Sequence, residues 1–424
     1  MSRRCCVLGV VFLALVRLSV SAEDLAVTAP EEVGLSKERL DRIGRFMKKT
    51  VADKRAAGAV ALVARHGKIA YCEAFGMQNT ETGTPMTKDT IFRIYSMTKP
   101  IVTVGVMMLY EEGRFRLGDP IGDYLPELRD MKIAKEKIDS ETGEKTLSLV
   151  PPKHPVTIRD LLRHTAGLPY NLPPDSPAGK MYREANMFGR NQTLGQLIEA
   201  LGKRPLSTEP GTVMEYGYST DVLARLIEVL SGPHLDAYLE QRILRPLGMN
   251  DTGFYVPAKK AERFAALYAL GPDGVIHPVP AGNRLNWNYL KRPTLLSGGG
   301  GLVSTASDYA VFCQMLLNKG ELDGVRLLSP KTVELMTQNH LTNGVSSGWL
   351  QHIGFGLGFF VEPEPGVMGE IGSKGTYGWS GGANTRFWID PEEELITVFL
   401  VQTFGSPYPP ADTFKNLAYQ AIIR

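Results

Sequence analysis

The stretch SMTKPIVTVGVMMLYEE, residues 96–112, decides how the rest of this 424-residue chain is interpreted. Its apolar content predicts a helix over 98–112, which Ser96 opens and in which Pro100 is tolerated because first-turn amides lack intrahelical partners. Residues three apart share a helix face, so the Lys99 amine can lie beside the Ser96 hydroxyl. The helix N-terminus and burial both disfavour a charged lysine, and a neutral amine can take the serine proton during attack. The pattern predicts a nucleophilic serine, although a capping serine beside an incidental lysine gives the same letters.

Two further segments carry residues suited to the same chemistry. Residues 209–223 (EPGTVMEYGYSTDVL) place Tyr216 and Tyr218 in a loop just before a helix, where a phenol near a lysine could relay protons. Residues 375–385 (GTYGWSGGANT) lead into a strand, and their glycines let the backbone approach a ligand closely. An amide in this second segment could donate to an oxyanion. Taken singly, a loop tyrosine is usually a packing residue and a glycine-rich stretch is usually a turn.

Outside these segments the chain alternates between strand-like and helical blocks. A helix is expected over 35–50 with Ser36 as its N-cap, followed by a hairpin of 60–64 and 68–74 around the turn 65–67. Further helices are expected over 157–163, 193–201, 220–230 and 235–247, and a charged, apolar-poor surface excursion over 131–155. Strands return at 353–362, 385–389 and 395–402, and a closing helix follows at 412–423.

Strands at both ends of the chain enclose this helical middle. The fold class predicted is therefore α+β, with one antiparallel sheet built from both termini and flanked by helices, and a mainly helical second lobe. We expect residues 23–95 and 295–424 to form the first lobe and residues 96–294 the second, with the ligand site in the cleft between them.

The first 22 residues have the three parts of a secretory signal. A basic start is followed by an apolar run and by Val20-Ser21-Ala22, a small-residue cleavage site. We expect export to the periplasm or the medium after cleavage near Ala22, and no membrane span in the mature chain; an uncleaved anchor is the alternative. Without the three arginines of the leader, the formal charge changes from +2 to −1, which gives no reason to expect nucleic acid as a partner. Oligomeric state is left open.

Cysteine and histidine usage predicts no metal site and no cofactor. Only Cys72 and Cys313 remain after the leader, and we expect two buried free thiols rather than a disulfide. No two histidines have zinc-ligand spacing on a helix. His164 is expected to hold a loop by hydrogen bonds rather than to act as a base.

Taken together in this order and spacing, the three chemistry-bearing segments resemble the class C β-lactamase-like serine hydrolases, and most closely the family VIII carboxylesterases. The resemblance runs from about residue 35 to the C-terminus and also covers residues 157–167 (TIRDLLRHTAG) and 298–308 (GGGGLVSTASD). It implies Ser96 as the acylated nucleophile, Lys99 as its activating base and Tyr216 as general base and proton shuttle. The amides of Ser96 and Gly382 would form the oxyanion hole. The remaining expected substrate-binding residues are Tyr218, Trp379, Ser380 and Gly381.

The chain departs from the β-lactamase pattern at two places. Tyr216-Gly217-Tyr218 stands where those enzymes have Tyr-x-Asn, and Trp379-Ser380-Gly381 stands where they have Lys-Thr-Gly. Without that lysine a cation for the carboxylate of a β-lactam is missing, so small neutral acyl esters become the expected substrates. The alternatives are a β-lactamase, a D-Ala-D-Ala carboxypeptidase or a D-aminopeptidase, for which Arg386 could supply the charge.

Two other readings of the sequence lead away from this chemistry. Residues 378–382 and 344–348 both match the Gly-x-Ser-x-Gly elbow of α/β-hydrolases, but that fold needs its histidine after the serine and the acid. No histidine follows Ser380, and after Ser346 only His352 remains, six residues on, which leaves no space for the acid. The glycine run 298–301 lacks the Lys-Ser/Thr of a phosphate loop and is expected to be a flexible wall of the cleft. A non-catalytic exported binding protein of the same fold is the remaining alternative.

Overall fold

The computed structural model describes residues 25–138, 140–143, 145–185, 187, 189–283, 285–341, 344–348, 353–405 and 410–424. The expected signal segment, residues 1–22, lies outside these ranges. Among the described residues no helix has both the length and the apolar character of a membrane span.

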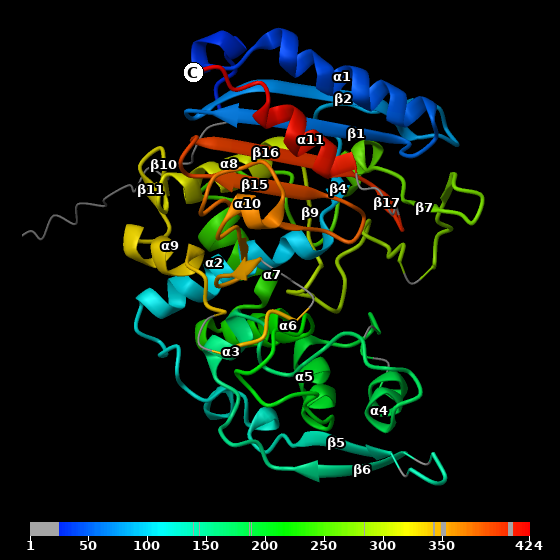
Figure 1. Cartoon of the computed structure of the whole chain (residues 1–424), viewed down its shortest axis with the longest axis vertical. Helices are drawn as coiled ribbons and strands as arrows, with labels where there is room; N and C mark the ends of the chain where they lie inside the picture. The colour runs from blue at the N-terminus through cyan, green and yellow to red at the C-terminus, as the bar shows by residue number, and fades with distance from the viewer. Residues whose placement is uncertain are drawn as a thin grey trace, which may run out of the picture.

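An antiparallel sheet of eight strands runs through the upper half of the molecule in Figure 1. Its order is β12-β13-β14-β15-β16-β1-β2-β3. The strands are β1 Gly58–Arg65, β2 Lys68–Asn79, β3 Thr84–Pro85, β12 Gly354–Phe355, β13 Phe360–Val361, β14 Tyr377–Ser380, β15 Arg386–Asp390 and β16 Leu395–Val401. The pair of β1 and β16 joins the N-terminal and C-terminal parts of the chain, since Val60 of β1 lies opposite Leu400 of β16. The prediction of one antiparallel sheet from both termini is confirmed.

Helices cover both faces of this sheet. One face carries α1 Lys37–Ala52 and α11 Pro410–Tyr419, and the other carries α2 Thr98–Glu111 and α8 Ala306–Leu317. The side chains of β1 alternate between the two cores: Ala59, Ala61 and Val63 face α1 and α11, while Val60 and Leu62 face α2 and α8. Because both faces are covered, every residue of β1 is buried.

Local signals account for the expected elements at the N-terminal side of the sheet. The Ser36 hydroxyl accepts a hydrogen bond from the Arg39 amide and caps α1. His66 and Gly67 both have positive φ, +51° and +76°, as the two-residue turn between β1 and β2 requires.

The lower half of the molecule is mainly helical (Figure 1). It contains α3 Ile158–Leu162, α4 Pro177–Glu184, α5 Leu194–Gly202, α6 Ser219–Ser231 and α7 Leu235–Leu239. The helix α6 packs against α3, α5 and α7 of this half and against α2 below the sheet, so it is the central helix of this half. Two short helices, α9 Pro330–Thr337 and α10 Pro365–Met368, belong to the C-terminal part of the chain.

Several expected boundaries are corrected by the structure. The excursion 131–155 lies at the surface as expected, but it contains the hairpin β5 Ile133–Ile138 and β6 Lys145–Val150. The single strand expected over 353–362 is the short pair β12 and β13, because Gly356 and Gly358 turn the chain between them. The helix expected over 235–247 stops at Leu239 and continues as one wide turn over Glu240–Leu244. The remaining short strands are β4 Phe92–Arg93, β7 Tyr268–Leu270, β8 Ile276–Pro278, β9 Val303–Ser304, β10 Glu321–Leu322, β11 Val325–Arg326 and β17 Thr403–Phe404.

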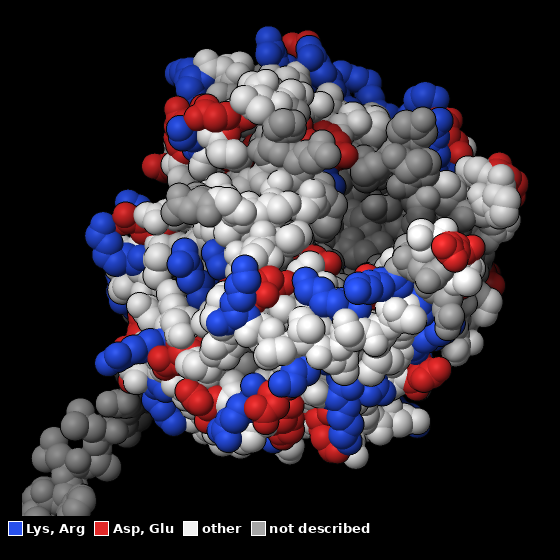
Figure 2. Space-filling model, turned by 60° about the horizontal axis from the view of Figure 1, so that its bottom comes forward, with Lys and Arg blue, Asp and Glu red and all other residues white. Residues whose placement is uncertain are grey.

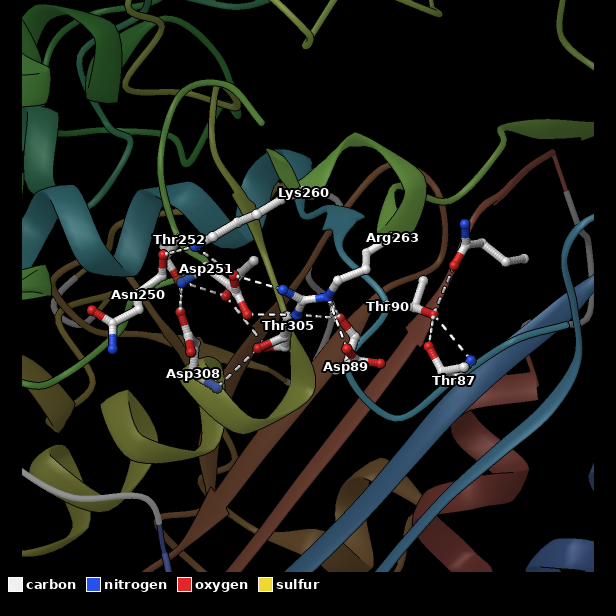
Figure 3. A network of polar contacts seen from close by, with 12 residues as sticks. Thr87, Asp89, Thr90, Asn250, Asp251, Thr252, Lys260, Arg263, Thr305 and Asp308 are labelled. Atoms are coloured by element: carbon white, nitrogen blue, oxygen red, sulfur yellow. Dashed lines mark hydrogen bonds and ion pairs between the residues drawn. The ribbon is translucent and has the colours of Figure 1, made fainter. Parts of the chain in front are cut away.

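A polar network connects residues 250–263 with Asp89 and with the start of α8 (Figure 3). The Arg263 guanidinium donates to both carboxylate oxygens of Asp251, at 3.1 and 2.6 Å, and forms an ion pair with Asp89 at 2.9 Å. Asp308, in the first turn of α8, accepts from the Asp251 amide and from the Thr252 hydroxyl, both at 2.8 Å. These bonds fix segments that lie far apart in the sequence.

The face turned forward in Figure 2 carries both kinds of charge. Lys and Arg are interspersed with Asp and Glu, and a hollow opens toward one side of this face. On this face no broad patch of one sign stands out, as the nearly neutral chain leads one to expect.

Candidate active site

Ser96 lies at the base of α2, in a single 3-10 turn over Tyr95–Met97 that leads into the helix. Tyr95 has a φ of +43°, a conformation that costs a non-glycine residue about 1–3 kcal/mol and is concentrated at functional sites. The N-cap of α2 is Met97, without a side-chain cap. The alternative that Ser96 is an ordinary capping serine is therefore wrong, and its hydroxyl is left for other contacts.

The Lys99 amine is the centre of the site. It is 1% exposed and donates to the Gly299 carbonyl at 2.6 Å, to the Ser96 Oγ at 3.4 Å and to the Tyr170 hydroxyl at 3.4 Å. Its nitrogen also lies 4.3 Å from the centre of the Tyr216 ring. The structure thus brings the three expected catalytic side chains together around one buried amine.

Tyr216 is oriented from the sheet side by Trp379 of β14. The Trp379 Nε1–H donates to the Tyr216 hydroxyl at 3.4 Å, and the two rings pack with centroids 5.4 Å apart. Trp379 is only 4% exposed and also packs against Phe355 and Phe360. Trp379 therefore supports Tyr216, and its expected contact with substrate stays a prediction.

The segment after β14 brings a backbone amide to the serine. Gly382 and Ser96 both line a cavity of about 160 Å³. Among the described residues the Gly382 amide has no hydrogen-bond acceptor, so it can donate to an oxyanion there. Gly381 must be glycine because a Cβ would lie 2.4 Å from the Ile94 carbonyl oxygen, and Ser380 stands half-exposed at the end of the strand. Since β14 is followed by another strand and not by a helix, Ser380 is not a nucleophile elbow.

Four aromatic residues and a group of aliphatic ones form the rest of this cavity. Its other lining residues are Tyr95, Tyr170, Met187, Leu197, Tyr218, Asp221, Trp287, Leu295, Ser297, Gly299 and Gly300. Tyr218, which is 3% exposed, lines this cavity and packs its ring with a centroid 4.7 Å from that of Tyr170; its part in substrate binding stays a prediction. A larger cavity of about 360 Å³ between α7 and residues 250–257 contains none of these residues.

Tyr170 and Asp221 are components of the site that the sequence did not single out. The Tyr170 hydroxyl donates to Asp221 at 3.4 Å, and burial together with the Asp221 charge raises the pKa of Tyr170 well above its usual value. Asp221 also accepts from the Ser297 hydroxyl at 2.7 Å and from the Gly299 amide at 3.0 Å. Asp221 therefore fixes the peptide whose carbonyl accepts from Lys99. Their only sequence signal is position: Tyr170 follows the segment 157–167, and Asp221 lies in the first turn of α6.

The glycine run 298–301 is a wall of the cleft, but a closely packed one. A Cβ on Gly299 would lie 2.3 Å from the Tyr170 hydroxyl, and one on Gly298 would lie 2.7 Å from the Thr220 carbonyl oxygen. A flexible loop was expected, but the segment is closely packed, and these positions hold glycine because a Cβ would collide with its neighbours.

Two alternative roles remain to be compared with the structure: His164 as a catalytic base, and Arg386 as the cation that replaces the missing lysine. His164 is fully buried against the Tyr216 ring, and burial, with the nearby Lys99 charge, holds its pKa well below 6.5. Its backbone carbonyl accepts from the Glu215 amide at 2.8 Å, which fixes the loop that carries Tyr216. Arg386 forms an ion pair with Asp412 of α11, so its charge is already engaged on that helix.

Neither cysteine takes part in a disulfide. Cys72 is half-buried and Cys313 is buried, and burial raises the pKa of both thiols. Among the residues with described positions, no group of His, Cys, Asp and Glu could hold a metal ion.

Comparison with known proteins gives a consistent picture. Residues 43–421 match the family model described as Beta-lactamase. Protein Rv1367c of Mycobacterium tuberculosis is 34% identical over 82% of this chain and 86% of its own length. Esterase EstB of Burkholderia gladioli is 31% identical over 85% of this chain and 90% of its own length. The solved structure of EstCE1, a hydrolase with promiscuous acyltransferase activity, superposes with a TM-score of 0.76 at 26% identity and covers 90% of this chain and 99% of that one.

Proposed function

This chain belongs to the Beta-lactamase family, and from that membership we propose that it is a serine hydrolase that cleaves small acyl esters through an acyl-enzyme on Ser96. The observation that carries the proposal is the Lys99 amine, buried 3.4 Å from the Ser96 hydroxyl and 4.3 Å from the centre of the Tyr216 ring. A lysine amine next to a serine hydroxyl can act as the base that removes the serine proton, a role that simple packing does not need.

The proposed reaction has two halves. In the first, the Ser96 Oγ forms a bond to the acyl carbon while its proton passes to Lys99. The C–O bond to the alcohol then breaks, Tyr216 gives its proton to the leaving oxygen, and Lys99 passes the serine proton to Tyr216. In the second half water attacks the acyl carbon while its proton passes through Tyr216 to Lys99. The bond to the Ser96 Oγ breaks and Lys99 returns the proton to that oxygen, which releases the carboxylic acid and restores the serine. The Ser96 and Gly382 amides stabilise the negative oxygen formed in each half.

Trp379 supports an ester rather than a β-lactam as substrate. It stands where the β-lactamases have a lysine, and its indole is packed against Phe355 and Phe360. No lysine therefore stands at position 379 to bind the carboxylate of a β-lactam. Arg386 does not replace the lysine because it pairs with Asp412.

A direct test compares two chromogenic substrates on the purified full chain. We expect hydrolysis of 4-nitrophenyl butyrate, and hydrolysis of a chromogenic cephalosporin to be far slower. A serine-directed phosphonate should add one mass increment, located on Ser96 by peptide mapping. Cleavage of the cephalosporin alone would favour the β-lactamase alternative, and absence of both hydrolysis and labelling would favour a non-catalytic binding protein.

Variants of the three side chains separate the roles. Ser96→Ala should abolish labelling and turnover, and Lys99→Ala and Tyr216→Phe should each lower kcat by about 10³-fold or more, as members of a coupled unit do. Near-normal turnover by Lys99→Ala would contradict the assignment of the base.

A further inference from the structure

Three oxygen atoms surround the Lys99 amine, and they decide which way its lone pair points. They belong to the Gly299 carbonyl at 2.6 Å, the Tyr170 hydroxyl at 3.4 Å and the Ser96 hydroxyl at 3.4 Å. A lysine ammonium has three hydrogens, so the neutral amine has two hydrogens and one lone pair. When the Gly299 and Tyr170 oxygens accept the two hydrogens, the lone pair faces the Ser96 hydroxyl, as removal of the serine proton requires.

The Gly299 and Tyr170 oxygens differ in the hydrogen bonds that they can form. A carbonyl oxygen only accepts, whereas a tyrosine hydroxyl can also donate its single hydrogen. A Tyr170 hydroxyl that donated to Lys99 would occupy the lone pair that Ser96 needs. Tyr170 therefore serves as an acceptor for Lys99 only when a third group takes its hydrogen.

Asp221 takes the hydrogen of Tyr170. Its Oδ2 lies 3.4 Å from the Tyr170 hydroxyl, and the hydrogen comes from Tyr170 because a carboxylate only accepts. Burial together with the Asp221 charge raises the pKa of Tyr170 well above its usual value, so the hydroxyl keeps this hydrogen at neutral pH. The lone pairs of the Tyr170 oxygen are thus left for Lys99.

The same carboxylate also holds the other acceptor of the amine. Its Oδ1 accepts from the Gly299 amide at 3.0 Å and from the Ser297 hydroxyl at 2.7 Å. Gly299 is the residue whose carbonyl accepts from Lys99. Asp221, which is 2% exposed in the first turn of α6, is therefore hydrogen-bonded to both residues that accept the hydrogens of the neutral amine.

We propose that Asp221 is a positioning residue that aims the lone pair of Lys99 at the Ser96 hydroxyl. It does so by accepting the Tyr170 hydrogen and by holding Gly299, so that both neighbouring oxygens accept from the amine. When the Ser96 proton passes to the Lys99 nitrogen, the new N–H bond faces the Ser96 oxygen, and the other two hydrogens stay with Gly299 and Tyr170. This proposal rests on the ester hydrolysis proposed above, and it deepens that proposal by naming what orients the base.

Asp221→Asn tests the direction of the Tyr170 hydrogen bond. An amide accepts only through its oxygen, and the Gly299 N–H needs that oxygen at the Oδ1 position, so the amide nitrogen faces Tyr170. Tyr170 then accepts from the amide and turns its own hydrogen to the Lys99 lone pair. We expect kcat for 4-nitrophenyl butyrate, and the rate at which a phosphonate labels Ser96, to fall by about 10²-fold.

Removal of the Tyr170 hydroxyl separates this role from support of the fold. Tyr170→Phe alone removes one acceptor of Lys99, and both rates should fall by about 10-fold or less. In the Asp221→Asn background the same change removes the misdirected hydrogen, so the double variant should be about 5- to 10-fold more active than Asp221→Asn. Asp221→Ala, which also leaves the Tyr170 hydrogen without its acceptor, should show the same recovery and serves if Asp221→Asn does not fold.

Asp308→Asn is the matched control. Asp308 is a buried carboxylate in the first turn of α8, and like Asp221 it accepts from a backbone amide and from a hydroxyl. It does not line the Ser96 cavity, and both rates should change by less than about 3-fold in this variant.

Three results would overturn the proposal. They are a double variant in which the two single losses multiply, unchanged rates in Asp221→Asn, and an equal loss in Asp308→Asn. The first would assign Asp221 a purely structural role, since a structural defect is not relieved by the loss of a hydroxyl. Failure of the proposed function is recognised separately, because then the unaltered protein neither cleaves the ester nor is labelled on Ser96.

Discussion

Single side chains set the chemistry of this site through contacts with one or two neighbours. Lys99 is held by the Gly299 carbonyl and faces Ser96, and Tyr216 is held by Trp379. The sequence predicted that Lys99 faces Ser96, because residues three apart on a helix share a face. It did not predict that the Trp379 indole donates to the Tyr216 hydroxyl, since these two residues meet only through the packing of the sheet against the helical lobe.

Trp379→Phe tests the bond to Tyr216. The substitution keeps an aromatic ring in contact with Phe355 but removes the N–H that donates to the phenol oxygen. We expect kcat for a 4-nitrophenyl ester to fall by about 3- to 30-fold, with little change in KM, because one neutral hydrogen bond is lost. Trp388→Phe, which alters a buried tryptophan in the other core, is the control and should leave kcat unchanged. A rise in KM alone would mean that Trp379 touches substrate.

Because the pKa of His164 is lowered in the folded protein, we expect the free energy of unfolding to decrease in acid. In the folded protein its pKa is held well below 6.5, so below about pH 6.5 the unfolded chain binds a proton that the folded chain does not. The free energy of unfolding therefore decreases as the pH falls through this range, by up to about 1.4 kcal/mol per unit for this residue. We expect His164→Asn to remove that part of the acid slope in urea unfolding between about pH 7 and about pH 5. Asparagine tolerates the φ of +57° at this position, and an unchanged slope would contradict the assignment.

Secondary-structure elements place these side chains, and their ends matter most. The helix α3 begins at a capping box, in which the Thr157 hydroxyl accepts from the Asp160 amide and the Asp160 carboxylate accepts from the Thr157 amide. It ends before His164, whose carbonyl holds the Tyr216 loop. Periodicity and capping residues predicted this helix and most others to within a few residues. They did not predict where α7 widens into a different helical turn, because that depends on packing against α2 and α6.

The glycine run beside α6 gives a test at this level. Gly299→Ala would place a Cβ 2.3 Å from the Tyr170 hydroxyl and 2.6 Å from an Asp221 oxygen, so the carbonyl that holds Lys99 must move. On Gly300 the nearest atom would be 3.5 Å away, an ordinary contact. We expect kcat to fall by about 10²-fold or more in Gly299→Ala and much less in Gly300→Ala, measured on the same ester. Equal effects would show that the run does not position Lys99.

The whole protein joins its two chain ends in one sheet and closes that sheet with α11. Lys415 of α11, with a side chain 2% exposed, donates to Glu362 at 2.6 Å, and the Glu362 side chain is 1% exposed. Burial raises the pKa of Glu362, while Lys415 opposes that shift. This pair connects the last helix to the segment after β13, and neither residue lines the Ser96 cavity, so we expect it to act on stability.

Lys415→Met should lower the free energy of unfolding by about 3–5 kcal/mol, because it leaves the Glu362 carboxylate buried without its cation. The double variant Lys415→Met with Glu362→Leu should recover most of this loss, since both charges are then absent. Denaturant unfolding of the four proteins in the cycle measures the coupling between the two residues. A double variant as unstable as the sum of both single variants would show that the pair is not coupled.

The sequence by itself determined most of the helices, the antiparallel sheet built from both termini and flanked by helices, and the placement of Ser96 beside Lys99, because these follow from periodicity and from neighbours within one helical turn. It also carried the resemblance that identified the fold. Only the tertiary structure decided that Tyr170 and Gly299 accept hydrogen bonds from Lys99, that Asp221 fixes Gly299 and that Arg386 is engaged with Asp412. Those contacts join residues tens to hundreds of positions apart, and no local pattern in the chain encodes which of them meet.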